Sequence, residues 1–164
     1  MSVAGILQSV YDSGLGTAIR VGSFLFPSFE SIHVLMATTV VGTIAIVDLR
    51  LIGYAAHRKG ARQLILDLLP FTWGAFALAA VTGSLLFTSN ATGYAANGPF
   101  LTKMVLLVLA GINMAIFHLT AYRRIDEWND ALPPPKVVRI AGASSLILWI
   151  VIVFSARWIG FTIS

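Results

Sequence analysis

Residues 31–47, Ser-Ile-His-Val-Leu-Met-Ala-Thr-Thr-Val-Val-Gly-Thr-Ile-Ala-Ile-Val, contain no Asp, Glu, Lys or Arg and decide the fold class. A helix of about 20 mostly apolar residues crosses a bilayer, so this stretch predicts a membrane span. Three further uncharged stretches cover residues 68–102, 104–122 and 140–156. The first of these three is too long for one helix, but its end at residues 89–99 is rich in turn-forming residues. The sequence therefore predicts an all-α, integral membrane four-helix bundle.

The expected spanning helices cover about residues 27–56, 70–90, 99–122 and 137–160, in a single domain of residues 1–164. Pro27, Pro70 and Pro99 lie near three of the expected starts, where a missing backbone N–H costs nothing. Residues 2–11 are expected to form a short interfacial helix, or else an ordered or frayed terminus. His57 is expected in the loop after the first span, and residues 126–130 in a solvated loop with an interfacial tryptophan.

Composition and charge limit the classes of function. Of 164 residues, 57% are hydrophobic and 11% are charged, whereas a soluble domain has about 25% charged residues. The positive-inside rule places loops that are rich in Lys and Arg in the cytoplasm, which predicts that both termini face outward (N-out/C-out). The net charge of +4 therefore reflects topology and does not indicate nucleic-acid binding. The absence of cysteine excludes disulfides, thiolate metal sites and cysteine catalysis. The basic loop residues are Arg58, Lys59 and Arg62 after the first span, and Arg123, Arg124, Lys136 and Arg139 after the third.

Four ionisable residues are expected at one depth, near the outer boundary of the membrane. Glu30 lies one helical turn before His33, Lys103 opens the third span, and Arg157 ends the fourth. A helix rises about 1.5 Å per residue, which puts His33 and Lys103 roughly 6–9 Å below the outer boundary. Ionisable groups inside a span are costly, so each one is a candidate functional residue.

A second polar layer is expected near the inner boundary. It combines His118 of the third span with Asp48 and Arg50 at the end of the first, close to Trp73. The rise per residue separates His33 and His118 by roughly 20 Å, so the two imidazoles cannot ligate one iron within a subunit.

The outer layer fits a haem b. An imidazole can serve as the axial ligand of haem iron, which assigns that role to His33. Lys103 and Arg157 would pair with the propionates, and Glu30 would orient the imidazole. On this hypothesis the protein serves electron transfer or redox chemistry, and the inner layer is a second cofactor site or a proton or quinone site. The inner layer consists of Asp48, Arg50 and His118.

Other readings of the same residues stay open. Copper could bind Glu30, His33 and Met36, which lie at helical spacing, in a copper or small-solute transporter or tolerance protein without haem. The chain could also be an accessory subunit of a larger membrane complex with no cofactor. Lys103 and Arg157 could simply reach the outer headgroups. Homo-oligomerisation and the identity of a redox partner are left open by the sequence.

The chain resembles a known superfamily in its first and third spans. The first span reads His33-x8-Gly42-x7-Arg50-Leu51, and the third opens Lys103-Met104-Val105-Leu106. These patterns resemble the superfamily of the membrane protoporphyrinogen oxidase, which carries haem b, and of copper resistance protein D. Glu-Ser-x-His, Asp-Leu-Arg-Leu and Asn-Gly-Pro-Phe resemble an uncharacterised bacterial four-helix family over about residues 24–161.

The resemblance implies a multi-pass protein of the bacterial inner membrane. In the oxidase family a first-helix histidine is thought to ligate haem and a third-helix lysine is important, which implies roles for His33 and Lys103. That family also has a histidine beyond the middle of its third helix, where this chain has Asn113. The resemblance therefore implies the scaffold and the importance of His33, without implying a particular reaction.

Overall fold

Four long helices form the body of the protein, which we describe from a computed structural model that covers residues 2–54 and 59–163. They are α3 (Leu25–Ile52), α4 (Ala61–Ser89), α6 (Gly98–Leu119) and α8 (Lys136–Thr162). All four are long and apolar enough to cross a membrane. This confirms the predicted all-α bundle with four spans. His57 lies outside the described residues.

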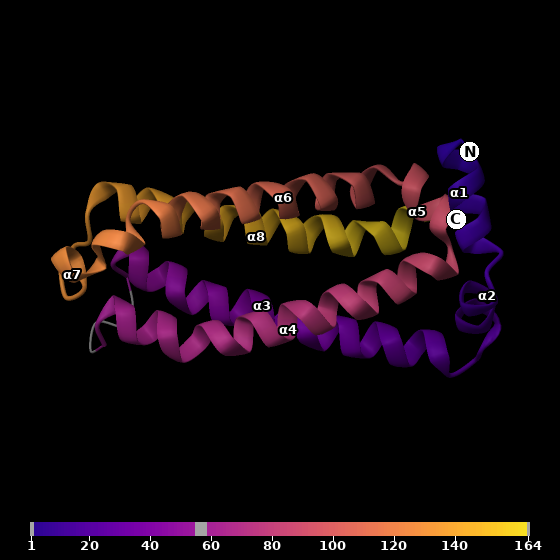
Figure 1. Ribbon diagram of the computed structural model, residues 1–164, viewed down its shortest axis with the longest axis horizontal. Helices are drawn as coiled ribbons and strands as arrows, with labels where there is room; N and C mark the ends of the chain where they lie inside the picture. Colours follow the sequence, from indigo (N-terminus) through magenta and orange to yellow (C-terminus); the bar gives the residue numbers. More distant parts are fainter. Residues whose placement is uncertain (1, 55–58, 164) are drawn as a thin grey trace.

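The four helices are packed unevenly. Helix α3 packs along both α4 and α8, and α8 packs along α6, whereas the described residues of α4 and α6 share no extended contact. Figure 1 shows the resulting two pairs, α3 with α4 and α6 with α8, as an elongated bundle. The order across the bundle is therefore α4, α3, α8, α6, which leaves α4 and α6 at its margins.

Three short helices gather at the end of the bundle that holds both termini (Figure 1), which we call the outer end after the predicted topology. They are α1 (Val3–Tyr11), α2 (Gly14–Val21) and α5 (Ala91–Ala96). The side chains of Ser2 and Ser13 cap α1 and α2 by accepting from backbone N–H groups. Arg20 lies over the Tyr11 ring and donates to the Ser89 carbonyl at 3.0 Å, which ties α2 to the end of α4. Of the two alternatives left open for residues 2–11, the structure has the helix, whereas α2 was not predicted.

The largest error in the predicted boundaries concerns α4, which begins at Ala61 and contains Pro70 in its interior. Proline lacks an N–H and so removes one bond of the helical ladder. In a membrane, nearby hydroxyl groups and neighbouring helices can compensate for such a loss. The carbonyl that loses its helical partner is that of Leu66, and the nearby Thr72 hydroxyl lies 3.0 Å from the Leu68 carbonyl and 2.8 Å from the Thr43 hydroxyl of α3, which links the two helices here. The prediction that a helix starts near Pro70 is wrong. The residues around a proline look the same in sequence whether the proline begins a helix or lies inside one.

Two further boundaries differ from the prediction for local reasons. Helix α3 ends at Ile52 because Gly53 adopts a left-handed conformation with φ of 90°, which only glycine adopts without strain. The predicted turn-rich loop contains α5, since the Asn90 side chain caps it by accepting from the Gly93 N–H at 3.2 Å. Asn97 caps α6 in the same way and donates to the Thr162 hydroxyl of α8 at 2.9 Å.

The inner end of the bundle holds a compact apolar cluster. The predicted solvated loop at residues 126–130 begins instead within α7 (Ile125–Trp128), which follows the 3₁₀ helix η1 (Tyr122–Arg124). Trp128 was predicted at the interface but is 5% exposed, and its indole N–H donates to the Ala121 carbonyl at 3.0 Å. Burial of that ring is what folds the loop back onto the bundle. The cluster comprises Leu51, Ala61, Ile65, Phe117, Ile125, Trp128 and Val138.

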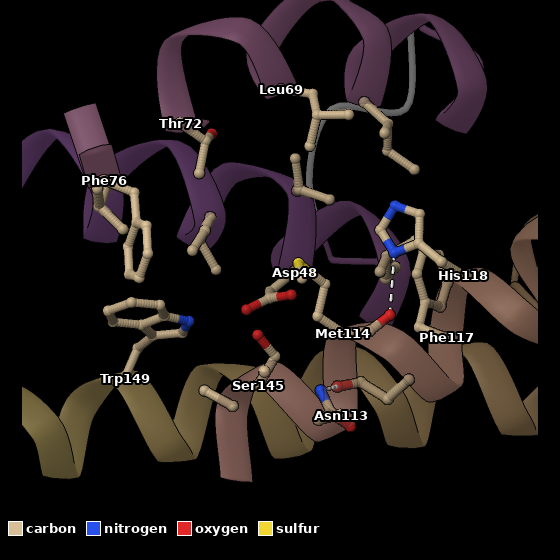
Figure 2. Close-up of a pocket in the computed structure, with 18 of the residues that line it drawn as sticks. Asp48, Leu69, Thr72, Phe76, Asn113, Met114, Phe117, His118, Ser145 and Trp149 are labelled. Carbon is tan, nitrogen blue, oxygen red and sulfur yellow. Dashed lines mark hydrogen bonds between the residues drawn. The ribbon is translucent and has the colours of Figure 1, made fainter. Parts of the chain in front are cut away.

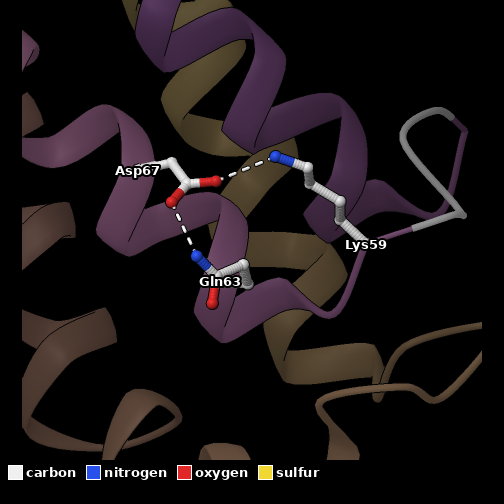
Figure 3. Close-up of polar contacts among 3 residues, drawn as sticks. All are labelled: Lys59, Gln63 and Asp67. Carbon is white, nitrogen blue, oxygen red and sulfur yellow. Dashed lines mark hydrogen bonds and ion pairs between the residues drawn. The ribbon is translucent and has the colours of Figure 1, made fainter.

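The start of α4 carries a small exposed polar network, shown in Figure 3. The Lys59 ammonium lies 2.9 Å from the Asp67 carboxylate, which also accepts from the Gln63 amide at 2.7 Å. All three residues lie at the surface of the inner end, where such pairs contribute about 0–1 kcal/mol. The network therefore steadies this loop without deciding the fold.

Candidate functional site

His33 lies between α3 and α4 in the outer half of the bundle. Its Nδ1 is 2.9 Å from the Ala79 carbonyl oxygen and 3.2 Å from the Thr82 hydroxyl. Because a carbonyl only accepts, Nδ1 carries the proton, and the neutral ring then keeps a free lone pair on Nε2. Gly83 makes this placement possible, since a Cβ there would lie 2.9 Å from the ring carbon Cε1.

The structure brings two of the predicted outer-layer residues to His33. Lys103 of α6 and Glu30 of α3 both interact electrostatically with the imidazole. Lys103 is half-buried, whereas Glu30 is exposed. Glu30 also acts on Tyr94 of α5: burial, and to a smaller degree this carboxylate, raises the pKa of the Tyr94 phenol above its ordinary value. Tyr94 therefore stays neutral beside the layer at physiological pH.

Arg157, the fourth residue of the expected outer layer, is directed elsewhere. Its side chain is exposed, and its guanidinium carbon lies 4.7 Å from the ring centroid of Phe161 on the same helix. Met36, one turn further along α3 than His33, is half-buried. Over residues 2–54 and 59–163, no group of three or more His, Asp or Glu side chains is placed to hold a metal ion.

The expected inner layer separates into two parts. Asp48 and His118 line one cavity, but Arg50 points into the inner loops instead. The Arg50 guanidinium donates to the carbonyls of Lys59 and Asn129, at 3.2 Å and 2.9 Å. Asp48 and Arg50 form no ion pair with each other or with any other described residue. Arg50 therefore holds the inner loops together. Asp48 and His118 are the two residues of the expected inner layer that line the cavity.

The cavity lies in the inner half of the bundle and has a volume of about 340 Å³. Figure 2 shows its walls, with Thr72 and Phe76 from α4 on one side and Ser145 and Trp149 from α8 on the other. Its surface is mostly apolar with a few polar groups, which is the usual character of a small-molecule site. The aromatic residues that line it are Trp73, Phe76, Phe117 and Trp149.

Asp48 is the most unusual group in this cavity. It is 4% exposed, and its Oδ2 has no hydrogen-bond partner among the described residues. Figure 2 shows its carboxyl group facing Ser145, with the indole nitrogen of Trp149 on the side of the ring toward Asp48. A buried polar atom without a partner costs about 1–3 kcal/mol, and is commonest where a ligand or water completes the site.

His118 faces the cavity from α6. Its Nδ1 is 2.9 Å from the Met114 carbonyl, so this nitrogen donates and Nε2 keeps its lone pair in the neutral ring (Figure 2). The ring packs against Phe117 and Tyr122, with centroid distances of 5.4 Å and 5.1 Å. Both predicted site histidines are thus oriented by a main-chain carbonyl, at opposite ends of the bundle.

Ser145, Trp149 and Asn113 reach the cavity but were not singled out from the sequence as part of one site. Serine is common where membrane helices pack together, so Ser145 by itself does not indicate a site. The signal that could have found it is its spacing from Trp149: residues four apart on a helix share a face, and both lie at the depth of Asp48. The Asn113 amide donates to the Ala141 carbonyl at 3.1 Å, which joins α6 to α8 in the cavity wall.

The fold is that of a four-span, all-α membrane protein. A family model, described as a family of unknown function (DUF6644), matches residues 12–162. The chain belongs to this family. Comparisons with curated proteins and with solved structures find no match.

Proposed function

We propose that this protein binds haem b in the membrane and serves electron transfer or redox chemistry, with His33 as an axial ligand. The observation that supports this proposal is the hydrogen bond from His33 Nδ1 to the Ala79 carbonyl. Histidines that ligate metals almost always donate their second ring N–H to a carbonyl, carboxylate or water, which fixes the ring and leaves the other nitrogen free. The protein itself holds the His33 ring in this arrangement.

The residues around His33 fit a haem in part. Lys103 approaches from α6 and would pair with a propionate, because it is a half-buried cation within electrostatic reach of the imidazole. Glu30 lies on the same side and would favour a positively charged iron centre. Arg157 is exposed and stacked on Phe161, so we assign it no propionate. A bound haem would supply one-electron chemistry at its iron, and this chain's own residues would hold and orient it.

A visible absorption spectrum of the purified protein, produced with ample haem and recorded oxidised and dithionite-reduced, tests the proposal. We expect a Soret band and sharp reduced α and β bands in the wild type. The bands should be absent from His33→Asn, whose amide can still donate to the Ala79 carbonyl but offers no imidazole. They should persist in the matched control His118→Asn.

Two results would overturn this assignment. A colourless wild-type protein would reject haem and leave copper or small-solute transport, or an accessory role, to be separated by metal analysis. Bands that survive in His33→Asn and disappear in His118→Asn would move the ligand to the inner cavity.

Gly83→Ala probes the same ligand without removing it. The added methyl group would lie 2.9 Å from Cε1 and 3.3 Å from Nδ1 of His33, so the imidazole must turn. We expect about tenfold weaker haem binding, since an off-rotamer side chain costs roughly 0.5–1.5 kcal/mol. Gly42→Ala is the control because a Cβ at Gly42 meets nothing within 4 Å. Equal haem affinity in the two variants, measured by titration, would show that the orientation of His33 does not matter.

A further inference from the structure

The inner cavity holds two hydrogen-bond acceptors that pair with no residue the structure describes. One is Oδ2 of Asp48, which is buried, has no hydrogen-bond partner over residues 2–54 and 59–163, and faces the cavity. The other is Nε2 of His118, whose lone pair is free because Nδ1 donates to the Met114 carbonyl. Asp48 is 4% exposed, so an acceptor there that is left unpaired is costly, whereas His118 is half-buried. The missing partner is therefore a molecule that carries hydroxyl or other donor groups.

The rest of the cavity selects a flat and mostly apolar molecule. Its walls include four aromatic side chains, and Trp73 and Phe76 of α4 meet edge to face with centroids 6.0 Å apart. Aromatic rings pack well against such walls. The described lining includes no Lys or Arg, so it offers no counter-ion to a phosphate. A phospholipid headgroup therefore fits poorly, whereas a hydroxylated aromatic ring fits both the walls and the acceptors.

The packing of the helices indicates how such a molecule enters. Helices α4 and α6 both line the cavity but lie at the margins of the bundle without an extended contact. Trp73 and Phe76 of α4 are 48% and 39% exposed, and Met114 of α6 is 38% exposed. These lining residues thus also reach the surface that faces lipid. Access is sideways, from the bilayer, which suits a ligand with a long apolar tail.

We propose that this cavity binds the head group of a lipid-soluble hydroquinone, which enters from the bilayer between α4 and α6 and donates a hydroxyl hydrogen bond to Asp48. His118 is the second acceptor, and the aromatic walls hold the ring. This site is separate from His33 and stands independently of haem binding.

Calorimetric titration of the purified protein in phosphatidylcholine nanodiscs, under anaerobic conditions, tests this proposal. The probe is a decyl-substituted benzohydroquinone, and its dimethyl ether is the comparison because it has the same ring and tail but no donor. We expect saturable binding of the hydroquinone. Its affinity should be at least about tenfold higher than that of the ether, because one hydrogen bond to a charged or polar group contributes about that much.

Two pairs of variants connect the binding to the cavity. Asp48→Asn should weaken hydroquinone binding about tenfold, whereas Asp67→Asn, the same change at the exposed inner end of α4, should leave it unchanged (Figure 3). Gly111→Phe should abolish binding, because Gly111 lines the cavity and a Cβ there meets nothing within 4 Å. Gly74→Phe is its control, with equal space around the Cβ but no place in the lining.

The competing outcomes are distinct from those of the haem experiment. Equal binding of the hydroquinone and its ether would overturn the proposed hydrogen bond. Unchanged binding in both Asp48→Asn and Gly111→Phe would overturn the site itself. Absence of saturable binding to the wild type would overturn the ligand class. None of these results depends on the Soret band or on His33.

Discussion

Replacing Arg50 with methionine is expected to lower the free energy of unfolding by about 3 kcal/mol, because two main-chain carbonyls lose a charged donor. Arg50 is 1% exposed and reaches two loop carbonyls that belong to Lys59 and Asn129. Methionine fills much of the volume of the side-chain stem but cannot donate. The Asn129 carbonyl would keep the Ala61 N–H at 3.0 Å but lose its bond to the guanidinium, the Lys59 carbonyl would lose the Arg50 donor, and the two inner loops would lose their common anchor.

The measurement is unfolding of the detergent-solubilised protein, with Arg62→Met as the matched control. Arg62 lies in the same region, but its ion pair with Asp126 joins side chains that are 51% and 76% exposed. Exposed pairs contribute about 0–1 kcal/mol, so this control should change stability little. Equal losses of stability in Arg50→Met and Arg62→Met would mean that the buried Arg50 guanidinium stabilises the fold no more than an exposed one does.

Replacing Gly142 with leucine is the second change with a large expected effect. Helix α8 approaches α3 closely at Gly142: a Cβ there would lie 2.9 Å from the Leu51 Cβ and 3.1 Å from the Asp48 carbonyl oxygen. The backbone oxygen cannot turn aside as a flexible side chain can, so the two helices must separate. Overpacking of this kind costs typically 1–3 kcal/mol, and we expect about 3 kcal/mol for a side chain as large as leucine.

Gly160→Leu is the control for this prediction, since Gly160 lies on the same helix and a Cβ there meets nothing within 4 Å. Its thermal midpoint should stay close to that of the wild type, because surface substitutions usually change stability by about 0.5 kcal/mol or less. The Gly142 variant should also weaken hydroquinone binding, because Asp48 lies in the α3–α8 contact that it opens. A stable Gly142→Leu protein would show that this contact is looser than the distances indicate.

The close approach of α3 and α8 links stability to the inner site. Gly142 allows the helices to meet beside Asp48, and the next turn of α8 places Ser145 opposite the carboxyl group (Figure 2). Glycines let helix backbones approach closely in lipid, where packing replaces the hydrophobic effect as the force between helices. The same contact therefore supports the bundle and buries the carboxyl group that we assign to ligand binding.

Gly83 allows a similar close contact between helices in the outer half of the bundle. It leaves room for the His33 ring against α4, and the Ala79 carbonyl on that helix then fixes the ring nitrogen. Ala79 and Gly83 are small residues that let α4 pack closely against α3 at His33. Their second effect, the orientation of an imidazole, follows from the identity of the neighbouring side chain and is invisible in α4 alone.

The number, order and approximate depth of the four spans were determined by the sequence alone. Hydropathy is a local property, and a helix rises by a constant amount per residue, so depth can be read by counting. That reasoning correctly brought Lys103 and Glu30 close to His33, and it placed His118 at the depth of Asp48. At residues 2–11 the sequence left a short helix or a frayed terminus open, and the structure has the helix α1 there, followed by the unpredicted α2.

What depth cannot determine is the direction in which a side chain points around its helix axis, and only the tertiary structure decided this. Asp48 and Arg50 are two residues apart, yet one faces the cavity and the other faces the loops, because residues at that spacing lie on different sides of a helix. Arg157 has the expected depth but turns outward onto Phe161. The continuation of α4 through Pro70 and the burial of Trp128 likewise depend on neighbours that are distant in sequence. Depth follows from each helix by itself, whereas the membership of a site follows from how the helices pack together.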